Sequence, residues 1–329
     1  MIPQETLQPP SAAQPITAER GGLASPRWTL HGLNNGFIFG ATCKIVGAVP
    51  RRLTYAIGEF STWLGWRLMD RTRLAIADNL GAIVPGEPLA ARERRALDTL
   101  RAYARDVIDF LRAIAATDDA QRQMFDFAPE HEQMFKTLLA EGRGIILVTG
   151  HYGNWEIGSV LMRIFHLPLT IVAMAEANPD VNRRRREIRD RLGVETIEVR
   201  KSLDTALQIR RRLADNRIVA MLMDRHVGRD RVAVTLAGRR AWFLKTPALM
   251  GLLSGAPLLP CFIERTGPAR FTACPGEPIF VATDLPREQA IQRAAQQFAD
   301  QLSVRLHQHP EYWYHFYRYW DSQPEDGPA

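Results

Sequence analysis

The sequence predicts an α/β fold with a mostly parallel central sheet flanked by helices. Two observations point to this fold. After residue 144, short apolar runs of strand length alternate with helical segments, which is typical of sheets assembled from strand–helix–strand units. The first of these runs, Gly144–Thr149, contains Ile, Ile, Leu and Val and therefore has the composition of a buried strand.

The chain before residue 89 is expected to differ from the rest. Residues 1–26 are rich in Pro, Gln, Ala and Ser, and this composition predicts a flexible tail. They lack the n-region and h-region of a signal peptide, so none is expected. Residues 27–88 predict a helical membrane-associating segment, because aromatic, apolar and basic residues are mixed from Trp28 to Met69. Neither half is a clean apolar run of about 20 residues, so no transmembrane span is predicted. A helical cap buried against the rest of the protein is the alternative.

Residues 89–320 are expected to form the α/β domain, with a short flexible tail at 321–329. A long amphipathic helix is predicted at 89–115, where apolar residues recur at intervals of three and four. The remaining strands are expected at residues 167–174, 195–199, 217–223, 258–263 and 271–281, and the remaining helices at 134–139, 178–192, 203–213, 247–253 and 287–307.

Composition narrows the possible partners. The chain has 42 basic and 36 acidic residues and a formal charge of +6, a mild excess that suits an anionic membrane surface or an acidic partner. No zinc-finger spacing or RNP-type motif supports nucleic-acid binding. The three cysteines, Cys43, Cys261 and Cys274, are scattered, which favours a reduced, cytosol-facing protein.

The turn after the first predicted strand holds an acid/base candidate. His151 stands at the carboxyl end of the strand, and Glu156 is expected in the first turn of a helix that begins near Asn154. Open α/β sheets bind their ligands at the carboxyl ends of the strands. A carboxylate on one imidazole nitrogen fixes the tautomer and makes the other nitrogen a better base. No Ser or Cys lies in this turn, so the pair favours deprotonation of a substrate hydroxyl. A structural histidine and a solvated glutamate are the alternative.

Three further clusters of chemically active residues follow. The predicted helix at Asn178–Arg191 holds six arginines, which repel one another and favour contact with phosphates or an acidic carrier over a merely solvated face. Asp224, Arg225 and His226 follow another predicted strand, at the same sheet edge as His151. The aromatic-rich block at 309–320 predicts either core packing or a second interfacial surface.

Together these motifs resemble a known family. The sequence GHYGNWE, which ends at Glu156, resembles the HxxxxE block of the bacterial lipid A secondary acyltransferases, the lauroyl and myristoyl transferases of the wider lysophospholipid acyltransferase group. The resemblance runs from about Trp28 to Arg318, and the chain departs from it at Leu236, Ala237 and Tyr312. Further matching blocks are RTRLAIADNL at 71–80, Asn178–Pro179 with Arg189, Asp224–Gly228, 236–260 and 310–320.

The resemblance implies a fold and a reaction. The fold would be glycerolipid acyltransferase-like, and the reaction would be acyl transfer from an acyl carrier protein thioester to a hydroxyl of a lipid A precursor or related glycolipid. His151 would be the general base, Glu156 would orient its ring, and Arg189 would stabilise oxyanion charge or fix a phosphate. No metal or cofactor is implied. The implied substrate-binding residues are Asn154, Asn178, Arg186, Arg191, Asp224 and Arg225.

The expected location is the cytoplasmic face of the bacterial inner membrane, with peripheral or monotopic attachment to an anionic surface. Two alternatives stay open. One is a sibling acyltransferase that moves an acyl chain from coenzyme A to a phosphatidylinositol mannoside or another lysolipid. The other is a membrane lipid-binding protein without enzymatic activity, in which His151 is incidental.

Overall fold

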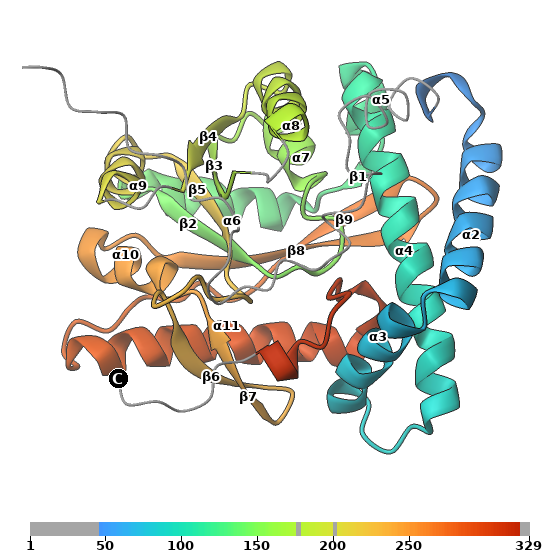
Figure 1. The fold of residues 1–329 in the computed structure, drawn as a ribbon. Coiled ribbons are helices and arrows are strands. Elements are labelled where there is room, and N and C mark those ends of the chain that lie inside the picture. Colours follow the sequence, from blue (N-terminus) through green and yellow to red (C-terminus); the bar gives the residue numbers. More distant parts are fainter. Residues whose placement is uncertain (1–45, 176–178, 200–202, 323–329) are drawn as a thin grey trace, which may run out of the picture.

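A computed structural model describes residues 46–175, 179–199 and 203–322 of the chain. Its centre is a seven-stranded sheet (Figure 1). Each neighbouring pair of these strands is parallel except β8 and β9, so the predicted α/β fold with a mostly parallel sheet is confirmed. In order across the sheet, the strands are β1 (Phe125–Asp126), β9 (Arg270–Pro275), β8 (Leu258–Gly267), β2 (Ile145–Thr149), β5 (Ile218–Leu222), β3 (Leu169–Ala173) and β4 (Glu195–Glu198).

Helices cover both faces of the sheet because the central strands are apolar on both faces. Along β2, Ile146 and Val148 point into one hydrophobic core, whereas Ile145 and Leu147 point into another. The first core includes residues of α9, α10 and α11, and the second includes residues of α6, α7 and α8. The helices are α2 (Arg51–Leu68), α3 (Asp70–Ile83), α4 (Leu89–Ala115), α5 (Asp118–Arg122), α6 (Pro129–Ala140), α7 (Gly158–Ile164), α8 (Pro179–Arg191), α9 (Asp204–Ala214), α10 (Thr246–Ser254) and α11 (Arg287–Gln308).

A two-stranded antiparallel hairpin, β6 (Val232–Leu236) and β7 (Arg239–Phe243), was not predicted from the sequence. Its two-residue turn places Ala237 at φ 48° and Gly238 at φ 74°, as a tight hairpin turn requires. The hairpin lies beside α11, where Gln296 accepts a hydrogen bond from Thr235 N at 2.8 Å. The alternating pattern VAVTL was the available signal for this strand.

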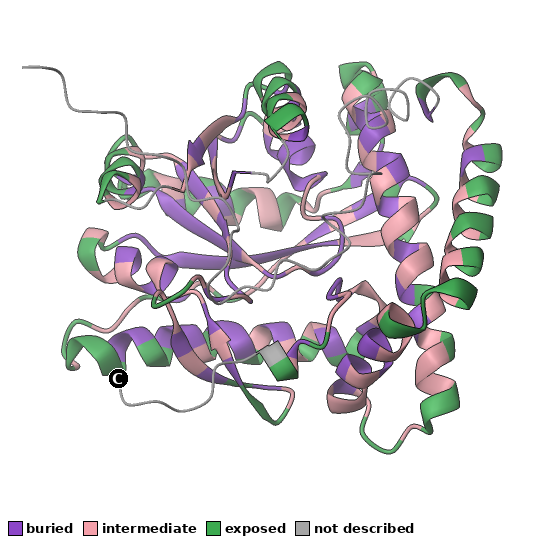
Figure 2. Cartoon of the chain, in the orientation of Figure 1, coloured by how far each residue is buried: buried purple, intermediate pink, exposed green. Residues whose placement is uncertain are grey.

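The helix α2 shows an apolar face to solvent. Leu53, Ile57 and Phe60 are 53%, 53% and 62% exposed, and Figure 2 shows α2 largely exposed along its length. This exposure does not fit the alternative of a fully buried cap. None of the helices in the described ranges has both the length and the apolar character needed to cross a bilayer. The expected flexible tail and the segment from Trp28 to 45 lie outside the described residues.

The next helix, α3, belongs to the core of the sheet domain. Ile76, Leu80 and Ile83 are 1–2% exposed and join the same core as α11. The expected domain boundary at residue 88 therefore does not separate α3 from the α/β domain. The apolar residues of α3 recur at intervals of three and four residues. This spacing predicts that one face of the helix is buried, but it does not predict which element that face packs against.

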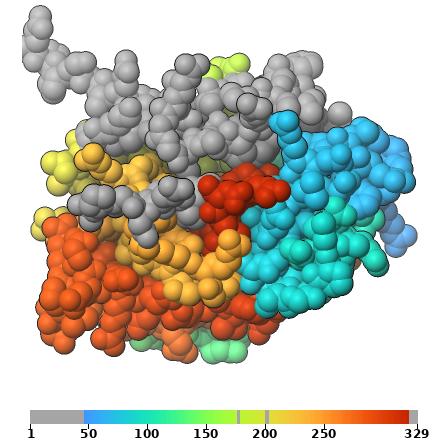
Figure 3. Space-filling model, turned by 60° about the horizontal axis from the view of Figure 1, so that its bottom comes forward, coloured from blue at the N-terminus to red at the C-terminus, as the bar shows by residue number. Residues whose placement is uncertain are grey.

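The C-terminal block lies against α3 and the strand ends. Asn79 donates hydrogen bonds to the carbonyl oxygens of His315 and Tyr317, at 3.0 and 2.7 Å, and accepts one from Tyr319 N at 2.8 Å. Figure 3 shows the C-terminal block in red, beside the blue and blue-green N-terminal helices. Trp313, Tyr314 and Tyr319 are buried, so of the two alternatives the aromatic block is core packing.

Candidate active site

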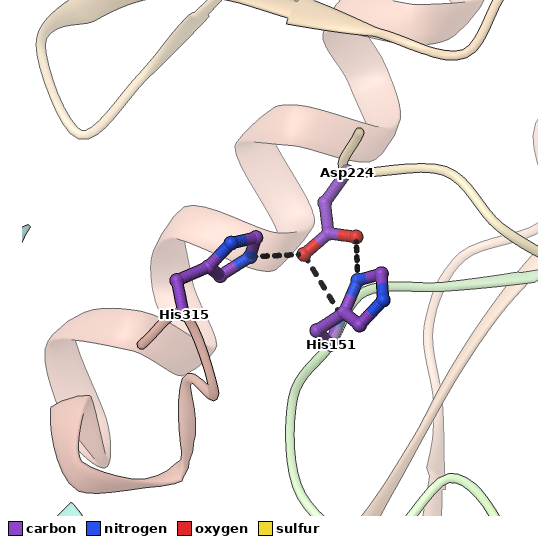
Figure 4. Close-up of side chains that lie close together, drawn as sticks. All are labelled: His151, Asp224 and His315. Atoms are coloured by element: carbon purple, nitrogen blue, oxygen red, sulfur yellow. Dashed lines mark hydrogen bonds and ion pairs between the residues drawn. The ribbon is translucent and has the colours of Figure 1, made fainter. Parts of the chain in front are cut away.

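The candidate site joins the ends of two neighbouring strands. β2 and β5 are parallel, with Thr149 opposite Leu222, so the residues that follow them lie at the same sheet edge. Oδ1 of Asp224 lies 2.7 Å from Nδ1 of His151, and Oδ2 accepts a hydrogen bond from His151 N at 2.8 Å (Figure 4). The carboxylate therefore holds both the imidazole ring and the backbone of the same residue.

A second histidine completes this cluster from the C-terminal block. Nε2 of His315 lies 2.9 Å from Oδ2 of Asp224, and Figure 4 shows the two rings on opposite sides of the carboxylate. The indole N–H of Trp313 donates to the same oxygen at 3.3 Å, and the hydroxyl of Tyr319 donates to the Asp224 carbonyl at 2.8 Å. Asp224 is 0% exposed, so these donors replace the water that a carboxylate otherwise requires.

The electrostatics keep the carboxylate ionised and the histidines neutral. Burial alone would raise the pKa of Asp224, but the interactions with His151 and His315 hold it well below its ordinary value. Burial is the main cause that lowers the pKa of His151 and lowers that of His315 to about 3, and the charge of Arg225 contributes to both shifts. With an ionised acceptor at Nδ1, the His151 ring carries its proton there and its lone pair on Nε2.

The free edge of this ring can accept a proton. Nε2 of His151 has no protein hydrogen bond within the described chain, and 14% of the side chain is exposed. A neutral imidazole, held in one tautomer by a buried carboxylate, is the usual arrangement of a general base. The geometry supports proton abstraction from a bound hydroxyl at Nε2.

The carboxylate expected to orient this ring is engaged elsewhere. Glu156 accepts a hydrogen bond from Nη1 of Arg185 on α8 at 2.7 Å. α7 begins at Gly158, so Glu156 lies in the turn before the helix and not in its first turn. Within the described residues, the His151 ring is therefore held by Asp224, which was expected to bind substrate, and the carboxylate of Glu156 is bonded to Arg185 instead.

Asn154 also differs from its expected role. Its Oδ1 accepts a hydrogen bond from Ile157 N at 3.2 Å, and its Nδ2 donates to the carbonyl of Asp106 on α4 at 3.1 Å. The side chain is buried and spans the loop and the neighbouring helix. Asn154 therefore ties the loop that follows His151 to α4.

A buried ion-pair cluster supports the same loop. Arg265 on β8 bridges Asp106 and Asp109 on α4, with both N–O distances at 2.6 Å. The hydroxyl of Tyr314 donates to Asp106 at 2.7 Å, while Tyr314 N donates to the carbonyl of His151 at 2.7 Å. The cluster thus connects α4 and β8 to the backbone of the candidate base.

The other predicted site residues lie on or near α8. Arg186 pairs with Glu198 on β4, Arg191 is exposed, and Arg189 is half-buried. Asn178 lies outside the described residues. Arg225 is half-buried beside the cluster, with its guanidinium 5.2 Å from the ring centre of Tyr317. The structure therefore brings Arg225 to His151 and ties α8 to the loop through Glu156.

The three clustered residues could also be considered as metal ligands. One donor atom from each of His151, Asp224 and His315 lies within 4.8 Å of the others. Both rings already hydrogen-bond to the carboxylate, so a cation would have to displace those bonds. The arrangement is that of a hydrogen-bonded triad.

His315 and Trp313 are site residues that the sequence analysis did not identify. The available signal was a polar histidine within an aromatic block, which must find a hydrogen-bond partner if that block is buried. The sequence did not show that the partner would be Asp224, because the block lies about ninety residues further along the chain.

Comparisons with known proteins place the chain in a family. The profile of the bacterial lipid A biosynthesis acyltransferase family matches residues 27–322. A phosphatidylinositol mannoside acyltransferase of Mycolicibacterium smegmatis is 25% identical over 232 residues, which cover 70% of this chain and 75% of that protein. A protein of the same name from Mycobacterium tuberculosis is 26% identical over 185 residues, 55% of this chain and 56% of that protein. The chain belongs to the bacterial lipid A biosynthesis acyltransferase family and is an acyltransferase, as the sequence predicted.

Proposed function

We propose that this protein transfers a fatty acyl chain from a thioester to a hydroxyl of a membrane glycolipid, with His151 as general base. The observation that carries the proposal is the buried Asp224 carboxylate at Nδ1 of His151, which leaves Nε2 free. Membership of an acyltransferase family supplies the reaction class, and this pair supplies the chemistry.

In the proposed reaction, Nε2 of His151 takes the proton of the acceptor hydroxyl as its oxygen attacks the thioester carbonyl carbon. A carbon–oxygen bond forms, and the tetrahedral intermediate carries the negative charge on the former carbonyl oxygen. The carbon–sulfur bond then breaks, and the imidazolium returns its proton to the leaving thiolate. Because thiolate is a good leaving group, the step needs no metal, no cofactor and no covalent enzyme intermediate.

Arginines would stabilise the charge that develops. Arg225 is close enough to lower the pKa of His151, so it can also favour a nearby oxyanion. On α8, Arg189 is proposed to stabilise the oxyanion or fix a phosphate of the acceptor, as the family resemblance implies. Arg186 and Arg191 lie on the same helix and are proposed to meet acceptor phosphates or an acidic carrier.

For the substrates, we propose an acyl carrier protein thioester as donor and a lipid A precursor as acceptor. The family description favours the lipid A precursor, and the carrier-protein donor is what the family resemblance implies. A second candidate acceptor, a phosphatidylinositol mannoside, is favoured by the names of the relatives at 25–26% identity, and we pair it with acyl coenzyme A as donor. Both candidates share the same base, the same leaving thiolate and a phosphate-bearing glycolipid.

The exposed apolar face of α2 supports a place at a membrane. Leu53, Ile57, Phe60 and Leu64 are exposed at helical spacing, and Arg67 near the end of the helix is charged. An amphipathic helix of this type lies in the interface plane of a bilayer. We propose peripheral attachment to the anionic cytoplasmic face of the inner membrane, where both candidate acceptors would be presented.

A donor-by-acceptor experiment tests the function. The purified protein is incubated with acyl carrier protein or coenzyme A thioesters, each paired with a lipid A precursor or a phosphatidylinositol mannoside, and products are identified by mass spectrometry. Transfer with one pair, abolished in His151→Ala, is expected. No transfer with any pair, or equal transfer by a folded His151→Ala variant, would favour a non-enzymatic lipid-binding protein or another base.

A further inference from the structure

A cavity away from the candidate base is lined by residues of the beginning of α2, the end of α4, α5 and the β8–β9 turn. Figure 1 shows where these elements lie. The cavity has a volume of about 330 Å³, and we refer to it as the arginine cavity. Arg51, Arg112 and Arg270 line it together with Gln123 and small or apolar residues. None of the lining residues in the described chain carries a carboxylate. Asp109 and Asp126 pair with Arg51 and Arg270 from outside the wall, so the three guanidinium groups keep an excess of positive charge over these two carboxylates.

The three guanidinium groups retain hydrogen-bond donors that the described chain does not use. Arg51 contacts Asp109 through Nε, at 3.4 Å, and Arg270 pairs with Asp126 through Nη2. Arg112 donates through Nη1 to the carbonyls of Val46 and Val49, at 2.5 and 2.8 Å, and no ion pair to it is found among the described residues. Each guanidinium has five N–H donors arranged for oxyanions, so three of them around one space suit a group with several oxygens.

The surroundings indicate the kind of molecule that would carry such a group. Arg51 is the first residue of α2, and Leu53, Ile57 and Phe60 follow it on the exposed apolar face. An anionic group bound at Arg51 would therefore lie beside a surface that favours acyl chains. A phospholipid headgroup has this combination of a phosphate next to hydrocarbon.

We propose that the arginine cavity binds a phosphate ester, and that the phosphate of an anionic lipid headgroup is the source that the neighbouring α2 surface favours. Binding there would hold α2 at the membrane at a defined depth. The site is separate from the His151 cluster, because none of its lining residues belongs to that cluster. It would position the enzyme on its substrate surface without taking part in the chemistry.

The test uses the full chain and a charge change in the cavity wall. Ala120 on α5 lines the cavity and is exposed, so Ala120→Glu adds a competing carboxylate, while Ala120→Gln adds nearly the same volume without charge. Binding to phosphatidylcholine vesicles with and without phosphatidylglycerol is measured by co-sedimentation. We expect Ala120→Glu to lower binding to the phosphatidylglycerol vesicles about tenfold, a typical scale for basic contacts at a membrane surface. Ala120→Gln should stay near wild type.

A second variant removes two of the cations. Arg51→Gln with Arg270→Gln should produce the same loss, whereas Arg287→Gln with Arg293→Gln, an equal charge change on exposed positions of α11, should not. Thermal unfolding with glycerol phosphate at constant ionic strength tests the soluble source. Stabilisation by glycerol phosphate that the cavity variants lose, without a change in vesicle binding, would keep the phosphate site and overturn the lipid source.

The proposal would be overturned altogether by either of two results. One is vesicle binding and glycerol phosphate stabilisation that are the same in Ala120→Glu and Ala120→Gln. The other is a loss in the α11 control pair as large as in the cavity pair, because general surface charge would then explain the binding.

Discussion

Nδ1 of His151 lies 2.7 Å from Oδ1 of Asp224, although 73 residues separate the two in the chain. The contact exists because β2 and β5 are neighbours in the sheet and both end at the same edge. The carboxylate five residues away, on Glu156, is paired with Arg185 instead. The local sequence motif therefore contributes the base, and a distant loop contributes the group that orients it.

The first prediction concerns the base itself. His151→Ala removes the only group proposed to take the hydroxyl proton and should lower turnover about 10²-fold or more, the usual scale for loss of a general base. Acyl transfer is measured in a steady-state assay with an unchanged circular dichroism spectrum as the control. Wild-type turnover in a folded variant would contradict the assignment.

Asp224→Asn tests the tautomer. The amide can donate to Nδ1 and would then favour the ring with its lone pair on the wrong nitrogen, so we expect turnover to fall about 10²- to 10⁴-fold. KM should change little, because the carboxylate is buried behind the ring and does not reach the substrate. A large rise in KM with normal turnover would instead assign Asp224 to substrate binding, as the sequence first indicated.

Glu156→Gln separates the two possible roles of the motif glutamate. If Glu156 positions Arg185, then Glu156→Gln and Arg185→Gln should each raise KM for a phosphorylated acceptor, and the double variant should add little. The pH dependence of turnover should stay as in the wild type. A shifted pH profile in Glu156→Gln alone would show that this carboxylate acts on His151 during the reaction.

The pH dependence follows from the lowered pKa of His151. The neutral ring is the active form, so turnover should be constant at neutral pH and should fall only as the pH drops through a pKa below 6.5. Burial is the main cause of this shift, and the charge of Arg225 adds to it. Arg225→Gln should therefore move the acid limb of the profile to higher pH. The profile of kcat/KM for both proteins provides the measurement, and an unchanged limb would contradict the prediction.

Because His315 is buried, we expect the folding stability of the protein to decrease at acid pH. The pKa of His315 is about 3 when folded and near 6.5 when unfolded, because burial disfavours the charged ring. As the pH falls from 6.5 towards 3, the unfolded chain binds a proton that the folded chain does not, so stability decreases over this window. Each pH unit in this window removes up to about 1.4 kcal/mol, and we expect a loss of several kcal/mol in total.

The matched control for this acid sensitivity is His315→Gln, whose amide can still donate to Asp224. Urea unfolding at a series of pH values should show a smaller loss of stability in this variant between pH 6.5 and 3. Equal acid sensitivity in both proteins would assign the effect to other groups.

Much of the fold could be predicted from the sequence, because the spacing of apolar residues depends only on neighbouring positions in the chain. The predicted helix at 89–115 coincides with α4. The strands β2, β3, β4 and β5 lie where short apolar runs between predicted helices indicated them. The hairpin β6–β7 was missed because its strands are partly exposed and follow each other without a helix between them. Its pairing depends on the turn at Ala237 and Gly238, which the sequence analysis did not recognise.

The α/β class, the acyltransferase family and the place of His151 at the carboxyl end of a central strand can all be predicted from the sequence, because they depend on local patterns and motifs. Which carboxylate meets the imidazole depends on the folded sheet, since adjacent strands lie about 4.8 Å apart and bring together loops that are distant in the chain. Desolvation then fixes the chemistry, because the same aspartate outside this buried cluster would be hydrated and would hold the ring less firmly.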